Sequence, residues 1–312
     1  MRYNIHISRL LLFICLSILL CACGDEKPKP SISGSSQEHT SDNGTWNSTP
    51  KVLTPEASGQ QVESCDVASI DYSNDSEGYV MVTYTGSNPK VKLQITGPDG
   101  ITYTYNLHGD YEVFPLTSGS GTYNISVFEN LSGTQYSTAM SINIDVSITN
   151  EFGPYLYPNQ YVNFNTSSLP VEKGKELAKS CNTDIEVVEH VYNYIIDNFT
   201  YDYDKAATVQ SGYLPVVDDV YNSNSGICFD YAAVMATMLR SQSIPTRLEV
   251  GYMGEAYHAW ISTYIQNVGW VNGIIEFDGS DWKLMDPTFA STSKSPESFT
   301  TEDSKYITKY VY

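Results

Sequence analysis

The chain has 312 residues, which is room for about two domains of ordinary size. Hydrophobic residues make up 41% of it, enough to build cores, while charged residues at 17% fall below the usual ~25%. The 17 basic and 36 acidic residues give a net charge of −19 at pH 7. A chain this acidic repels phosphate backbones, so the composition argues against nucleic acid as a partner.

The N-terminus has the layout of a secretion signal. Arg2 and Arg9 precede an apolar run, residues 10–23, that is shorter than the ~20 apolar residues needed to cross a bilayer. The run ends in Leu20-Cys21-Ala22-Cys23, which resembles a bacterial lipobox. The resemblance implies removal of residues 1–22, lipidation of Cys23 and anchoring outside the cytoplasm at the bacterial cell membrane. An ordinary signal peptide with a cysteine nearby is the alternative.

Two segments of different character follow the signal. Residues 23–64 are rich in Ser, Thr, Pro and Gly, which predicts a disordered tether. Between residues 65 and 149, β-branched and aromatic residues alternate with polar ones, and turn signals separate the runs. This pattern predicts an all-β sandwich of immunoglobulin-like size, serving as a spacer or an adhesive module. The expected strands cover residues 79–84, 91–95, 101–105, 123–127 and 140–144.

The cysteines outside the signal do not form a metal motif. Cys65, Cys181 and Cys228 are scattered singly, without a CxxC pair. The chain also lacks a DxDxDG calcium loop, so neither a metal nor another cofactor is predicted. Cys65 and Cys181 could pair in an oxidising compartment, and the sequence alone leaves this open.

Residues from about 150 onward change to a mixed pattern of helices and strands. Thr183 and Glu186 form a capping box ahead of apolar residues at helical spacing, which predicts a helix. A second, buried helix is expected from residue 229 to residue 240, with Asn224 or Ser225 as its N-cap.

Cys228 is expected at the N-terminus of that second helix. The unpaired amides there favour thiolate over thiol, so a lowered pKa is predicted. A small buried cysteine without chemistry is the alternative.

Two further residues complete a catalytic pattern. His258 begins an alternating strand, and Asp286 ends a later hairpin strand. Short connections imply antiparallel neighbours, so His258 can face Asp286. A carboxylate bound to one ring nitrogen leaves the other nitrogen free to take the cysteine proton.

At this point the chain resembles the transglutaminase-like superfamily of papain-like fold. The resemblance lies in Gly226-Ile227-Cys228, Ile244-Pro245-Thr246-Arg247, His258-Ala259-Trp260 and Asp286-Pro287-Thr288. It implies an α+β domain over residues 150–312, in which the cysteine-bearing helix packs on an antiparallel sheet. It also implies that Cys228 is the nucleophile, His258 the general base and acid, and Asp286 the residue that orients the histidine.

The resemblance suggests roles for neighbouring residues as well. Relatives have an oxyanion-stabilising side chain upstream of the cysteine. Tyr203 is the first candidate here and Tyr201 the second, with the Cys228 amide as the other donor. Many relatives carry an acid shortly after His-Ala-Trp, whereas this chain has Ser262 and Thr263. Packing or structural roles are expected for the remaining prominent residues, namely Trp260, Trp282, Arg240 and Arg247, the two arginines by pairing with acids.

These features indicate a cysteine enzyme that acts on amide bonds through a thioester. Water as the acceptor gives a peptidase or amidase, and an amine gives a cross-linking transferase. Surface tethering slightly favours hydrolysis of a protein, peptide or cell-wall peptide. The alternative is a non-catalytic adhesion protein that uses the same fold as a scaffold.

Overall fold

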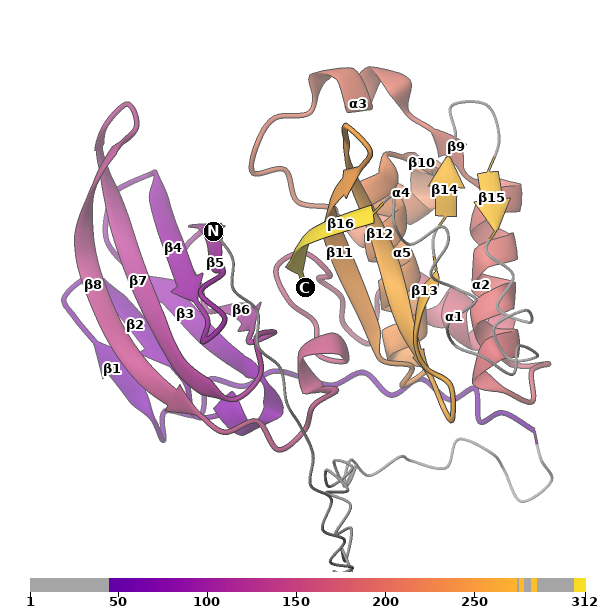
Figure 1. Cartoon of the computed structure of the whole chain (residues 1–312), viewed down its shortest axis with the longest axis horizontal. Coiled ribbons are helices and arrows are strands. Elements are labelled where there is room, and N and C mark those ends of the chain that lie inside the picture. The colour runs from indigo at the N-terminus through magenta and orange to yellow at the C-terminus, as the bar shows by residue number, and fades with distance from the viewer. Residues whose placement is uncertain (1–44, 274, 278–281, 285–305) are drawn as a thin grey trace, which may run out of the picture. The chain divides into compact units, whose positions relative to one another are not determined.

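The computed structural model describes residues 45–273, 275–277, 282–284 and 306–312. All of these residues belong to the larger of two compact units, Gly34–Tyr312. Its N-terminal part is built of strands alone, apart from short 3-10 turns, and its C-terminal part mixes helices with a sheet (Figure 1). The expected mixture of helix and sheet is therefore confirmed.

The N-terminal part consists of two four-stranded antiparallel sheets. Their strand orders are β1-β2-β3-β6 and β5-β4-β7-β8. The first sheet contains Val62–Ser64 (β1), Ala68–Asp71 (β2), Tyr79–Tyr84 (β3) and Glu112–Pro115 (β6). The second contains Val91–Thr96 (β4), Thr102–Leu107 (β5), Gly121–Ser132 (β7) and Gln135–Val146 (β8).

Alternation of side chains explains these strands. On β4, Val91, Leu93 and Ile95 are buried, while the intervening residues are partly exposed. Gly100 closes the turn to β5 with a positive φ of 80°, and its amide donates to Gly97 O at 3.0 Å. Each predicted strand region therefore contains an observed strand. The immunoglobulin-like assignment of residues 65–149 stays a prediction.

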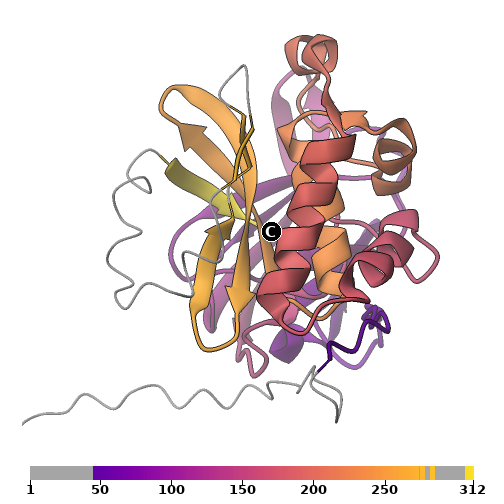
Figure 2. The ribbon, with the colours of Figure 1, turned by 90° about the vertical axis from the view of Figure 1, so that its right-hand side faces the viewer.

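Helix α5, Cys228–Ser241, is the centre of the C-terminal part. It contacts the helices α1, α2 and α4 and also the strands β11 and β12 (Figure 2). Every residue from Asp230 to Ser241 is buried, as its Ala- and Met-rich composition predicts. The other helices are Leu169–Ala178 (α1), Asp184–Asn198 (α2), Tyr203–Thr208 (α3) and Val217–Ser223 (α4). In the described ranges no helix has the length and apolar character required to span a membrane.

An antiparallel sheet with the order β13-β12-β11-β16 packs against α5. Gly251 on β11 is the register partner of His258 on β12. A Cβ atom at Gly251 would lie 2.0 Å from Ile307 O, so only glycine lets β16 approach here. The strands of this part are Thr246–Met253 (β11), Ala256–Ile265 (β12), Gly269–Gly273 (β13), Tyr306–Val311 (β16), the parallel pair Thr200–Tyr201 (β9) and Ser225–Gly226 (β10), and the hairpin Ile275–Phe277 (β14) and Trp282–Leu284 (β15).

The end of the predicted tether is packed against the C-terminal part. Trp46 is 7% exposed, its main-chain amide donates to Cys181 O at 2.9 Å, and its indole Nε1 donates to Gln242 Oε1 at 3.2 Å. Lys51 adds a main-chain bond to Ser241 O at 2.8 Å. One buried tryptophan and these hydrogen bonds order a stretch whose polar composition predicts a tether.

Arg240 ties α5 to two distant segments. Its guanidinium, 1% exposed, donates to the main-chain oxygens of Thr246, Tyr157 and Tyr312 at 2.8–2.9 Å. Burial lowers its pKa to about 9. Arg247 instead stacks on Trp270, with its Cζ 3.6 Å from the ring centroid. The expectation that these arginines pair with acids is wrong for the described residues, because main-chain oxygens and aromatic rings take that place.

We expect Arg240→Met to destabilise the fold strongly, because it removes a buried donor group that bonds the main-chain oxygens of Thr246, Tyr157 and Tyr312. The loss should be about 3 kcal/mol or more in the free energy of unfolding. Urea denaturation measures it, and Lys175→Met, at an exposed helix position, serves as the control. A loss no larger than that of the control would contradict the role given to Arg240.

Candidate active site

A buried carboxylate holds the start of the helix that carries Cys228. Asp230 is fully buried, and its Oδ2 accepts from the Ile227 amide at 2.8 Å and from Lys205 Nζ at 2.7 Å. Its Oδ1 accepts from the Tyr213 hydroxyl. A Cβ atom at Gly226 would lie 2.6 Å from Asp230 Cβ, so glycine is needed for this carboxylate to fit. Cys228 is thereby fixed as the first residue of α5, the predicted position.

The N-cap of α5 is Ile227, and the predicted caps Asn224 and Ser225 lie elsewhere. Asn224 takes a left-handed conformation, with φ 48°, and ends α4. Ser225 belongs to β10, which pairs with β9. Asp230, the third residue of α5, accepts from the amide of Ile227, which is the half of a capping box that the helix itself supplies.

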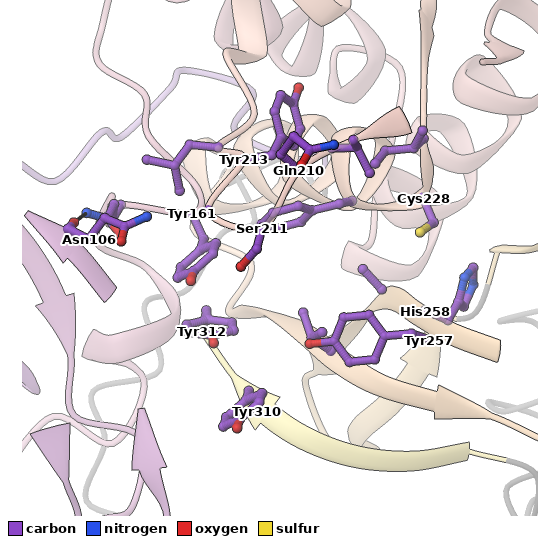
Figure 3. A pocket seen from close by; sticks show the side chains of 18 of the residues that line it. Asn106, Tyr161, Gln210, Ser211, Tyr213, Cys228, Tyr257, His258, Tyr310 and Tyr312 are labelled. Atoms are coloured by element: carbon purple, nitrogen blue, oxygen red, sulfur yellow. Dashed lines mark hydrogen bonds between the residues drawn. The ribbon is translucent and has the colours of Figure 1, made fainter. Parts of the chain in front are cut away.

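His258 lies next to Cys228 at one end of a cavity (Figure 3). The Cys228 sulfur is hydrogen-bonded to the main chain of Ala259, the residue after the histidine. His258 Nε2 is buried and has no hydrogen-bond partner among the described residues. The two predicted residues thus share one end of the cavity, and His258 is a neutral-imidazole candidate for general base in its vicinity.

Burial sets the charge of this pair. It raises the pKa of the Cys228 thiol above its ordinary value of 9.0, and hydrogen bonds from the main chain of Ala259 and Phe229 only partly oppose this. Burial also lowers the pKa of His258 below 6.5. The predicted lowering of the thiol pKa is wrong, because desolvation outweighs the helix N-terminus. Near pH 7 the pair is a neutral thiol beside a neutral imidazole.

The structure favours Tyr201 over Tyr203 as the neighbour of the nucleophile. Tyr201 pairs with Gly226 through β9 and β10, and its hydroxyl is hydrogen-bonded to the Cys228 main chain. Burial raises the pKa of Tyr201 to about 12, so the hydroxyl keeps its proton and can donate it. Tyr203 is 58% exposed and is not among the residues that line the cavity.

Other predicted residues are placed as follows. Trp260 is 4% exposed and lies nearly parallel to His258, with ring centroids 6.3 Å apart, in agreement with a packing role. Asp286, Cys23 and the side chain of Trp282 lie outside the described residues. That Asp286 orients His258 stays a prediction.

A buried acid, Glu249, lies next to the strand with the His-Ala-Trp motif. Ser262 Oγ donates to Glu249 Oε1, and Thr308 Oγ1 donates to Oε2 at 2.7 Å. Many relatives carry an acid shortly after the His-Ala-Trp motif. In this chain Ser262, which follows that motif, binds the carboxylate of Glu249 on β11. In the sequence, the position of Glu249 between the apolar Leu248 and Val250 was the signal that could have indicated this acid.

The other described thiols do not take part in this site. Cys65 is exposed and Cys181 is buried, and both are unpaired. Cys181 Sγ lies 3.2 Å from His190 Nδ1, but burial raises its pKa to about 11, as suits an unreactive thiol. In the part of the chain that the structure describes, no group of three or more His, Cys, Asp or Glu side chains could hold a metal ion.

The cavity beside Cys228 has a volume of about 580 Å³. Aromatic side chains from separate segments form much of its wall, and amide and hydroxyl groups lie among them. Figure 3 shows Tyr161, Tyr310 and Tyr312 away from the Cys228–His258 end. Most of these residues carry no sequence motif, because the cavity is assembled from segments far apart in the chain.

Known proteins resemble parts of this chain. The UPF0252 protein of Methanocaldococcus jannaschii is 26% identical over 215 residues, which are 58% of this chain and 58% of that protein. The chain thus spans little more than half the length of this relative.

Solved structures that match this chain do so at low identity and low TM-score. The periplasmic domain of TgpA from Pseudomonas aeruginosa, bound to ethylmercury, is 15% identical, with a TM-score of 0.33 over 76% of this chain and 78% of that one. Red sea bream transglutaminase is 13% identical, with a TM-score of 0.27 over 67% and 48%. A candidate cysteine protease from Cytophaga hutchinsonii is 14% identical, with a TM-score of 0.36 over 81% and 73%.

A family model covers the core of the site. Residues 172–273 match the model described as the transglutaminase-like superfamily, and this stretch includes Cys228 and His258. The match ends before Asp286. Residues 172–273 thus form a domain that belongs to the transglutaminase-like superfamily.

Proposed function

We propose that the protein is a cysteine enzyme that acts on amide bonds through a thioester intermediate. The observation that carries the proposal is the placement of Cys228 and His258 together in one cavity, with an unpartnered ring nitrogen on the histidine. Membership of residues 172–273 in the transglutaminase-like superfamily supports it.

The chemistry follows from the neutral pair. His258 takes the thiol proton as the Cys228 sulfur attacks the carbonyl carbon of the substrate. The C–S bond forms, and the C–N bond then breaks as His258 returns the proton to the leaving amine. The Cys228 amide and the Tyr201 hydroxyl bind the oxyanion in between, with Tyr201 giving up its bond to that amide. Asp286 orients the imidazole in this proposal.

The acceptor decides the outcome of the second half-reaction. Water resolves the thioester to an acid and gives a peptidase or amidase, whereas an amine forms a new amide and gives a transferase. We favour hydrolysis of a protein, a peptide or a cell-wall peptide, in keeping with the proposed location at the cell surface. The competing function is adhesion, with the domain as an inactive scaffold and the strands of residues 65–149 as an immunoglobulin-like binding module.

We expect Cys228→Ala to abolish turnover of a peptide library and to remove the covalent acyl-enzyme that mass spectrometry detects during wild-type turnover. Cys65→Ala, which removes an exposed thiol elsewhere, should change neither. Both variants should keep the wild-type circular dichroism spectrum. Turnover that survives Cys228→Ala, or a wild-type protein that cleaves or acylates nothing in a broad peptide and amine panel, would favour the adhesion function.

Tyr201→Phe should lower kcat by about a hundredfold or more, the cost of losing one oxyanion donor. Tyr203→Phe is the matched control, because it removes the same hydroxyl from a ring that is mostly exposed. Steady-state kinetics on any substrate found above measures both. Equal effects at the two positions would rule out Tyr201 as the oxyanion donor.

The proposed location rests on the lipobox resemblance at Cys23. Replacing Cys23 by Ser should move the protein from the membrane fraction to the soluble fraction of the expressing bacterium, because the acylated thiol is lost. Immunoblotting of the two fractions measures this. A variant that stays with the membrane would refute lipid anchoring at this residue.

A further inference from the structure

The active-site cavity extends well beyond the reactive pair. In Figure 3, Asn106 lies on the side opposite Cys228 and His258, and Tyr161, Tyr310 and Tyr312 lie between these two ends. Three residues of β4 and β5, namely Lys92, Thr104 and Asn106, line the cavity. A molecule held by Asn106 and its neighbours must therefore be extended if it is also to reach the sulfur.

The described residues of the cavity wall include no acidic side chain, neither Asp nor Glu, although 36 of the 312 residues of the chain are acidic. The carboxylates just behind the wall are bound by protein donors. Asp230 accepts from Lys205 and Tyr213, and Glu112 accepts from Gln160 Nε2 at 2.6 Å and from the His108 amide at 2.6 Å. The described wall thus adds no negative side chain of its own, in contrast to the acidic composition of the chain.

Lys92 supplies a positive charge to this wall. Within the described part of the chain, its only hydrogen-bond partner is Asn106 Oδ1, and no carboxylate pairs with it. An ammonium group has three donors, so two are left for another molecule. By contrast, Lys173, Lys175 and Lys205 each pair with an acid. Lys92 is thus a half-buried cation at a cavity whose described wall holds no carboxylate.

We propose that Lys92 binds a carboxylate of the acyl-donor peptide, so that the enzyme selects anionic peptides. The carboxylate lies at the Lys92–Asn106 end, the chain crosses the tyrosine-lined part of the cavity, and the reactive carbonyl lies at Cys228. Aromatic rings with hydroxyl groups suit such a chain, because they contact apolar side chains and also hydrogen-bond peptide groups. The inference rests on the proposed function for its acyl donor, but the binding of an anionic peptide can be measured without turnover.

The test uses the chain with Cys23→Ser, the change expected to make it soluble, and with Cys228→Ala, which cannot react. Its probes are fluorescent hexapeptides that carry one Glu, moved along the six positions, each with a Gln counterpart of the same shape. We expect at least one Glu peptide to bind about tenfold more tightly than its Gln counterpart in fluorescence anisotropy, as suits a charge-assisted hydrogen bond. The preference should decrease as salt is raised.

Variants of lysine assign the preference to one residue. Adding Lys92→Met should abolish the Glu preference, whereas Lys92→Arg should keep most of it. Lys90→Met is the matched control, because Lys90 is a neighbouring exposed lysine whose Nζ bonds Gly133 O and lies over Tyr136. Thermal unfolding of each variant shows whether it is folded.

Three results would overturn the inference: no binding of any peptide, no Glu preference at any position, or a preference that survives Lys92→Met in a folded protein. A Lys92-dependent Glu preference without any acyl-enzyme in the wild-type chain would leave the binding site standing and refute the proposed function. Turnover whose rate depends neither on Glu in the substrate nor on Lys92 would leave the proposed function standing and refute the anionic-peptide site.

Discussion

The arrangement of the site depends on one buried carboxylate, Asp230. A fully buried acid is costly to desolvate unless its oxygens are bound, and here they accept from Ile227, Lys205 and Tyr213. The bond to Ile227 sets where α5 begins and therefore where Cys228 lies. The bonds to Lys205 and Tyr213 hold the segment between α3 and α4, several residues of which line the cavity. One side chain thus couples the position of the nucleophile to the shape of its surroundings.

Local sequence patterns predicted those parts of the fold that depend on neighbours in the chain. The period of two between residues 79 and 144 located five strands, because alternate side chains on each face meet different surroundings. Thr183 was recognised as the cap of α2, and its hydroxyl accepts from the Glu186 amide at 3.2 Å. The reciprocal bond differs by one residue, since Glu186 accepts from Asn182 rather than Thr183. Long-range contacts escaped prediction, and the packing of Trp46 on Cys181 and Gln242 is the clearest case.

The same distinction applies to the site. Cys228 and His258 were predictable because each belongs to a short motif, and the structure brings them together. The direction in which the pKa of the Cys228 thiol shifts was not predictable. It depends on how much protein surrounds the sulfur, and the position at a helix start does not report that. The choice between Tyr201 and Tyr203 depended on a two-residue strand pairing that no periodic pattern announces. Lys92 carries no motif at all, and its relation to the cavity exists only after folding.

The packing of Trp46 against the catalytic part has a consequence for where an anchored copy could work. Under the proposed attachment at Cys23, the length of chain between the lipid and the packed protein would end at Trp46 rather than at the first strand. At about 3.3–3.6 Å per residue, that length reaches at most roughly 80 Å from the lipid. The active site would then be confined to a thin layer above the membrane. Its local concentration near molecules fixed in that layer would be high. Large immobile polymers in that layer are accessible to such an enzyme, and material deeper in the surroundings is not.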